Sequence, residues 1–72
     1  VMIEVNVTGE SLERVVALLP CMREPTIAPL HAGAGCAIKA AVPKRDLPTL
    51  IPEIKSHGGT DIVVSQLSQI IP

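Results

Sequence analysis

Residues 1–7 alternate between two kinds of side chain. The odd positions carry valine or isoleucine, whereas the even positions carry methionine, glutamate and asparagine. Because successive side chains of a β-strand point to opposite faces of a sheet, this period of two predicts a half-buried strand. We expect its β-branched face to join the core of the protein.

Two later segments show helical spacing instead. In each of them apolar residues recur at i, i+3, i+4 and i+7, namely at Leu12, Val15, Val16 and Leu19 and then at Leu47, Leu50, Ile51 and Ile54. This spacing places each set in one stripe along a helix. We expect Pro20 to end the first helix, and Gly58 with Gly59 to end the second. Pro52 lies inside the second helix, where it should remove a backbone hydrogen bond or introduce a kink.

Three further segments favour strands. Residues 24–30 include a β-branched pair but also Pro25 and Pro29, which have no N–H to donate, so this strand is expected at a sheet edge. Residues 36–42 alternate with a period of two and predict a third strand, with small or apolar residues on most of both faces. The Ile-Val-Val run within residues 61–67 predicts a fourth.

This order of elements predicts an α+β fold of the ferredoxin-like type, βαββαβ. Two βαβ units with right-handed crossovers give a four-stranded antiparallel sheet in the order 4-1-3-2, with both helices on one face. The order places the proline-containing strand at an edge, in agreement with its composition. The helix stripes should pack against Ile3, Val5, Ile38 and Val63 or their strand neighbours. The other sheet face should meet solvent, another domain or another subunit.

Length and charge limit the classes of function. The 72 residues are expected to form one domain, residues 1–72, whose two-layer core leaves little room for a deep catalytic cleft. Six basic and seven acidic residues give a net charge of −1, and Phe, Tyr and Trp are absent. Nucleic-acid-binding proteins usually show a basic face and stacking aromatics. No apolar stretch approaches the ~20 residues of a membrane span. We therefore expect neither nucleic acid nor a membrane as a partner.

The cysteines and histidines do not form a metal-binding pattern. Cys21 and Cys36 are too far apart for a Cys-x-x-Cys pair, which argues against a metal chaperone. His31 and His57 are isolated residues at a loop and at a helix end, and both are expected at the surface. We expect two buried thiols of a cytoplasmic protein, with a disulfide as the alternative.

The middle of the chain carries a more specific signal. Residues 25–30 read Pro-Thr-Ile-Ala-Pro-Leu, and this run resembles the second-strand signature of the C-terminal domain of long-form ATP phosphoribosyltransferase, Pro-Thr-[Val/Ile]-[Ser/Ala]-Pro-Leu. Residues 37–46 resemble the third strand and second-helix start of that family, and residues 58–64 resemble its step into the last strand. The resemblance covers the whole chain.

The resemblance implies a part in the first step of histidine biosynthesis. The family's enzyme is a glycosyltransferase that joins ATP to phosphoribosyl pyrophosphate with Mg²⁺, and its catalytic residues lie in two preceding domains. This domain is therefore expected to be non-catalytic, to have no cofactor of its own, and to follow those catalytic domains in one chain. The family's C-terminal domain is an allosteric, cytoplasmic regulatory domain. It binds L-histidine between subunits of a homo-hexamer, which gives feedback inhibition.

The same resemblance implies which residues would contact the effector. They are Asn6, Met22, Thr26, Ala41 and Asp61. Asn6 stands where the family commonly has an acidic residue, and Asp61 stands where a small residue is usual. Two further departures are Cys21 in place of a glycine and Gly35 in place of a tryptophan.

Other functions stay open from the residues alone. A free-standing small-molecule sensor of the same fold would show the same pattern, and a pure oligomerisation module would need only the open sheet face. A free-standing enzyme of this fold, such as an acylphosphatase, would need an arginine in a phosphate-binding loop, and the chain shows no such loop.

Overall fold

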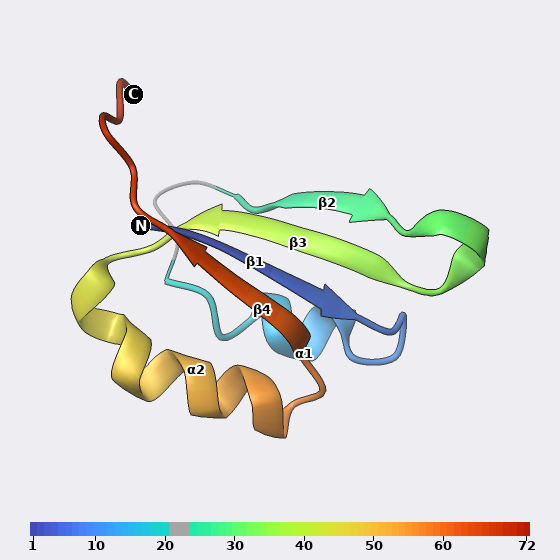
Figure 1. The fold of residues 1–72 in the computed structure, drawn as a ribbon. Helices are drawn as coiled ribbons and strands as arrows, with labels where there is room; N and C mark the ends of the chain where they lie inside the picture. Colours follow the sequence, from blue (N-terminus) through green and yellow to red (C-terminus); the bar gives the residue numbers. More distant parts are fainter. Residues whose placement is uncertain (21–23) are drawn as a thin grey trace.

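The computed structural model of the protein describes residues 1–20 and 24–72. Its strands and α-helices are β1 (Met2–Val7), α1 (Leu12–Val16), β2 (Thr26–Pro29), β3 (Cys36–Ala41), α2 (Leu47–Ser56) and β4 (Thr60–Ser65). The strands form one antiparallel sheet in the order β2-β3-β1-β4, and both helices lie on one side of it (Figure 1). This confirms the predicted architecture, including the edge position of the proline-containing strand.

The pairing register sorts the strand side chains into two faces. Val5 lies opposite Ile38, and both are buried beneath the helices. Glu4 lies opposite Lys39 and Asn6 lies opposite Ala37, one position along from these core residues. Because neighbouring positions of a strand point to opposite sides, this second set faces away from the helices. We call this second side the open face.

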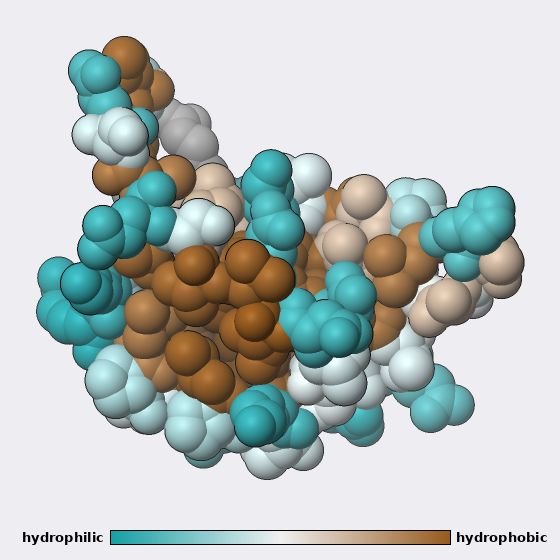
Figure 2. All heavy atoms as spheres, viewed as in Figure 1, coloured by the Kyte–Doolittle hydropathy of each residue, from teal (hydrophilic) through white to brown (hydrophobic). Residues whose placement is uncertain are grey.

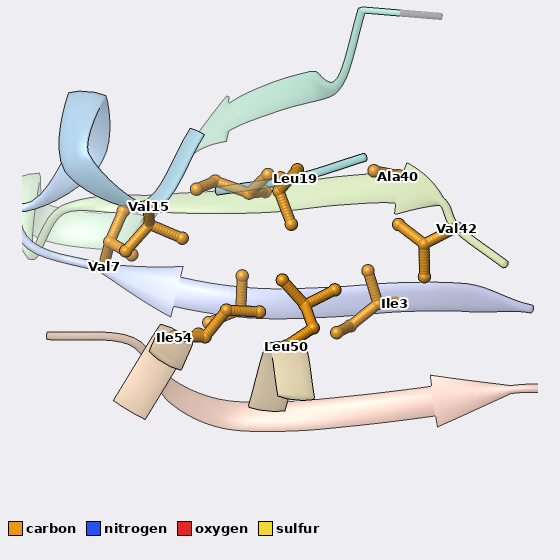
Figure 3. Close-up of a cluster of buried hydrophobic side chains, with 10 residues drawn as sticks. Ile3, Val7, Val15, Leu19, Ala40, Val42, Leu50 and Ile54 are labelled. Atoms are coloured by element: carbon orange, nitrogen blue, oxygen red, sulfur yellow. The ribbon is translucent and has the colours of Figure 1, made fainter. Parts of the chain in front are cut away.

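An aliphatic core fills the layer between the sheet and the helices (Figure 3). Its buried apolar members are Ile3, Val5, Val7, Val15, Leu19, Ile38, Ala40, Val42, Leu50 and Ile54. Of the stripe residues that we expected in the core, Leu12, Val16, Leu47 and Ile51 are only partly buried. Val63 is not in the core, because it lies opposite Glu4 and shares the open face; its neighbour Ile62 packs against the core instead.

The first helix is shorter than the sequence pattern suggested. α1 ends at Val16, well before Pro20. Beyond it, the Leu18 N–H donates to the Val15 carbonyl (3.0 Å) and the Leu19 N–H donates to the Val16 carbonyl (3.2 Å). These i to i+3 bonds wind the chain more tightly than an α-helix and still bring Leu19 into the core.

The second helix ends as predicted and tolerates its internal proline. Pro52 is exposed, and α2 continues without interruption around it. Proline has no N–H, so one backbone hydrogen bond of the helix is missing, and it is missing on the side that faces solvent. At the C-terminus, Gly58 has a φ of +104°, and the Gly59 N–H donates to the Ile54 carbonyl (2.8 Å). The Gly58 N–H donates to the Lys55 carbonyl (3.3 Å), which completes a Schellman cap.

The structure describes one of the two cysteines and both histidines. Cys36 is a free thiol and is only half-buried, less than the sequence suggested, whereas Cys21 lies outside the described residues. His31 is exposed as expected, and His57 is half-buried at the end of α2, where its Nδ1 lies 2.8 Å from the Glu53 carbonyl oxygen. In the part of the chain that the structure describes, no helix is long and apolar enough to cross a membrane.

Candidate functional site

A hollow of about 460 Å³ lies on the open face of the sheet. The open-face hollow is lined by Glu4, Asn6, Thr26, Ala28, Ala37, Ile38, Lys39, Asp61 and Val63. Ala28 and Ala37 are paired directly across β2 and β3. Because alanine side chains are short, they leave space between the longer polar side chains around them, and the sheet there can receive a small molecule.

Asn6 and Asp61 form a polar pair on the β4 side of the open-face hollow. Asn6 Nδ2 donates to Asp61 Oδ2 over 3.4 Å, across residues 55 apart in the chain. Thr60 Oγ1 lies 3.3 Å from the same carboxylate oxygen and 3.3 Å from the Asn6 carbonyl oxygen, so its hydroxyl can donate to either. Among the described residues, Asp61 Oδ1 has no hydrogen-bond partner and stays available to a ligand.

A β-bulge explains why Asp61 faces Asn6. The register between β1 and β4 shifts between Glu4 and Asn6, so that Asp61 and Ile62 together oppose Val5. Asp61 has a φ of +51°, the left-handed conformation of the first residue of a G1 bulge. Aspartate is one of the few residues other than glycine that adopt this conformation readily. The bulge keeps Ile62 against the core while it turns Asp61 towards the open face.

Thr26 and Ala41 lie on the other side of this face. Thr26, on the edge strand β2, pairs with Lys39 of β3 and lines the open-face hollow across from Asp61. Ala41 lines an adjoining pocket, which shares Thr26 and Lys39 with the hollow and is also lined by the C-terminal residues 70–72. The structure therefore brings Asn6, Thr26 and Asp61 around one hollow, places Ala41 beside it, and leaves Met22 outside the described residues.

Two charged residues of the hollow were not found by sequence reasoning. Glu4 and Lys39 form a cross-strand ion pair with 3.7 Å between Oε1 and Nζ, at directly opposed positions of the two central strands. Both are polar positions in alternating strands, but only the register shows that they meet. Since Glu4 and Lys39 offset each other's charge, Asp61 is the carboxylate of the hollow that has no cationic partner within the described residues.

These groups suit a small ligand with an ammonium group and a carboxylate. A carboxylate accepts hydrogen bonds from an ammonium, and a threonine hydroxyl can donate to a carboxylate. The Asn6–Asp61 pair and Thr26 supply these two needs from opposite sides of the open-face hollow. Within residues 1–20 and 24–72, no cluster of three or more His, Cys, Asp or Glu side chains is placed to hold a metal ion.

Comparison with known proteins gives a consistent set of relatives. The family model described as "HisG, C-terminal domain" matches residues 1–69. An ATP phosphoribosyltransferase of Pyrobaculum calidifontis is 37% identical over 70 residues, which cover 97% of this chain and 25% of the relative. One of Pelotomaculum thermopropionicum is 35% identical over 70 residues, covering 97% and 24%. One of Corynebacterium jeikeium is 33% identical over 67 residues, covering 93% and 24%. The chain thus spans about a quarter of the length of these relatives.

Proposed function

Because the chain belongs to the family of HisG C-terminal domains, we propose that it is the histidine-binding regulatory domain of an ATP phosphoribosyltransferase. Residues 1–72 would be the C-terminal part of that enzyme, and L-histidine would occupy the open-face hollow at a boundary between subunits of a homo-hexamer. ATP, phosphoribosyl pyrophosphate and Mg²⁺ would bind to the catalytic domains elsewhere in the same cytoplasmic chain. Bound histidine would slow them by favouring the low-activity state through its differential affinity.

The observation that carries this proposal is the contact between Asn6 and Asp61. The family resemblance predicts an acidic side chain at position 6 and a small one at position 61. This chain has an amide at position 6 and a carboxylate at position 61, and the two side chains are hydrogen-bonded. The negative charge is therefore present in the open-face hollow, on β4 instead of β1. An amino acid ligand would still meet one carboxylate for its ammonium.

Calorimetry on the full-length enzyme tests the proposal. A charge-assisted hydrogen bond is worth about 1.5–3 kcal/mol, so Asp61→Asn should weaken L-histidine binding by roughly 10- to 100-fold. Thr26→Val, which removes the hydroxyl and keeps the shape, should weaken it by about 10-fold. The exchange variant Asn6→Asp/Asp61→Asn restores one carboxylate beside one amide and should recover most of the affinity of the unmodified enzyme.

A charge change outside the open face serves as the matched control. Glu13 is an exposed residue of α1, so Glu13→Gln removes one carboxylate without touching the open-face hollow and should leave histidine affinity unchanged. Equal affinity of Asp61→Asn and the unmodified enzyme would show that this hollow does not hold the ligand. If histidine neither binds nor inhibits the intact enzyme, the regulatory function is wrong and an oligomerisation module becomes the better account.

A further inference from the structure

Lys39 is the basic side chain of the open-face hollow. It lies on β3, whereas the other basic residues that the structure describes lie on or directly before the two helices, namely Arg14, Lys44, Arg45 and Lys55. The neighbouring surface over β4 and α2 is largely apolar (Figure 2). Within the described part of the chain, a carboxylate bound in the open-face hollow would therefore meet one cation, the Lys39 ammonium.

The contact between Lys39 and Glu4 is a weak one. Lys39 Nζ lies 3.7 Å from Glu4 Oε1, which is longer than the roughly 2.7–2.9 Å of a charge-assisted hydrogen bond. The two side chains are 54% and 49% exposed, so water competes for both charges. Exposed ion pairs of this kind contribute little to stability. The Lys39 ammonium can therefore leave Glu4 at small cost.

The sheet register places Lys39 between Glu4 and Thr26. Lys39 lies opposite Glu4 in the pairing of β3 with β1, and opposite Thr26 in the pairing of β3 with β2. All three residues line the open-face hollow. An ammonium that turns from Glu4 towards Thr26 reaches the side where the threonine hydroxyl can donate to the same ligand carboxylate. The flexible four-carbon stem of lysine allows this turn without a movement of the backbone.

We propose that Lys39 binds the carboxylate of the amino acid ligand and gives up its contact with Glu4 to do so. The inference rests on the proposed function and adds to it the group that recognises the ligand's carboxylate. Asp61 lies beside Asn6, two strands away from Lys39, so the open-face hollow offers opposite charges to the two ends of a zwitterion. Without this contact, the two carboxylates of Glu4 and Asp61 against one ammonium would favour a plain cationic amine.

Calorimetry with two ligands on the full-length enzyme tests the role of Lys39. L-histidinol carries a hydroxymethyl group in place of the carboxylate of L-histidine and keeps the ammonium and the imidazole. The unmodified enzyme should bind L-histidine about 10-fold or more tightly than L-histidinol, the value of one charge-assisted hydrogen bond. Lys39→Met keeps the length of the side chain and removes its charge. It should weaken L-histidine binding by about 10-fold, leave L-histidinol binding unchanged, and so abolish most of the preference. Lys39→Arg retains the charge and should keep most of it.

Two other variants act as controls. Lys44→Gln removes a positive charge from an exposed residue before α2 and should leave the preference for L-histidine unchanged. Glu4→Gln removes the competing partner of Lys39 and should tighten L-histidine binding by up to about 5-fold. The inference is overturned if Lys39→Met keeps the preference, if it weakens both ligands equally, or if Glu4→Gln weakens L-histidine binding. An unmodified enzyme that binds neither ligand would instead overturn the proposed function, and this inference with it.

Discussion

Replacing Ile54 with alanine should lower the free energy of unfolding by about 2–5 kcal/mol. Ile54 is 0% exposed, and its side chain belongs to the aliphatic core between α2 and the sheet. The truncation leaves a cavity that the surrounding strands can fill only in part. A domain of this size has a total stability of the order of 5–10 kcal/mol, so the change removes a large share of it. Urea unfolding followed by far-ultraviolet circular dichroism measures the loss, since the chain has no tryptophan or tyrosine to report by fluorescence.

Two further variants serve as an exposed control and as a milder change at the same core position. Ile71→Ala removes the same atoms from a tail residue that is 80% exposed, and it should change the stability by less than about 0.5 kcal/mol. Ile54→Val removes one methylene group and should cost about 0.5–1.5 kcal/mol, which stays measurable if the alanine variant does not fold. An unchanged urea midpoint for Ile54→Ala would place Ile54 outside the core.

Adding a single methyl group at Gly35 should also be costly, at about 2–4 kcal/mol. Gly35 has a φ of +122°, which side-chain-bearing residues rarely adopt. A Cβ there would overlap the Val7 carbonyl oxygen and lie 3.2 Å from Thr8 Cα. Both neighbours are backbone atoms at the end of β1, so they cannot rotate away. Thermal unfolding of Gly35→Ala followed by circular dichroism measures the effect.

Two other glycines separate the causes of that loss. Gly33 has a φ of +71° with open space around its Cβ position, so Gly33→Ala should show only the backbone penalty of about 1–2 kcal/mol. Gly9 also has open space and no positive φ, and Gly9→Ala should be neutral or stabilising by up to about 1 kcal/mol. Equal melting temperatures for the Gly35 and Gly9 variants would contradict the close approach to β1.

The fold was predictable because its signals are local. Alternation at residues 1–7, two helical stripes, and prolines at positions 25 and 29 each determine one element or its place in the sheet. The side of Val63 was not predictable in this way, because three consecutive β-branched residues do not show which of them faces the core. The length of α1 was also misjudged, since Leu19 reaches the core through a turn as well as it would through a helix.

The candidate site was predictable only in part. The family resemblance pointed to Asn6, Thr26 and Asp61, and the structure places all three around the open-face hollow. The resemblance did not show that the amide at position 6 and the carboxylate at position 61 are hydrogen-bonded to each other, because this contact depends on the bulge between β1 and β4. A bulge shifts the register by one residue and leaves no clear mark in a single sequence. The pairing of Glu4 with Lys39 likewise needs the register of the sheet.

The central position of β1 has a consequence for how the domain assembles during synthesis. Asn6 of β1 bonds to Asp61 of β4, which lies 55 residues later in the chain. Closing a loop of that length costs about 3.5 kcal/mol of chain entropy. The short connection between β2 and β3 costs only about 1.5 kcal/mol by the same relation. The β2–β3 hairpin can therefore form early, whereas the pairing of β1 with β4 must wait until β4, the last of the four strands of this sheet in chain order, has been synthesised. The open-face hollow acquires the Asp61 carboxylate, which has no cationic partner among the described residues, only in that step, so a nascent chain cannot offer this group to a ligand before the sheet is complete.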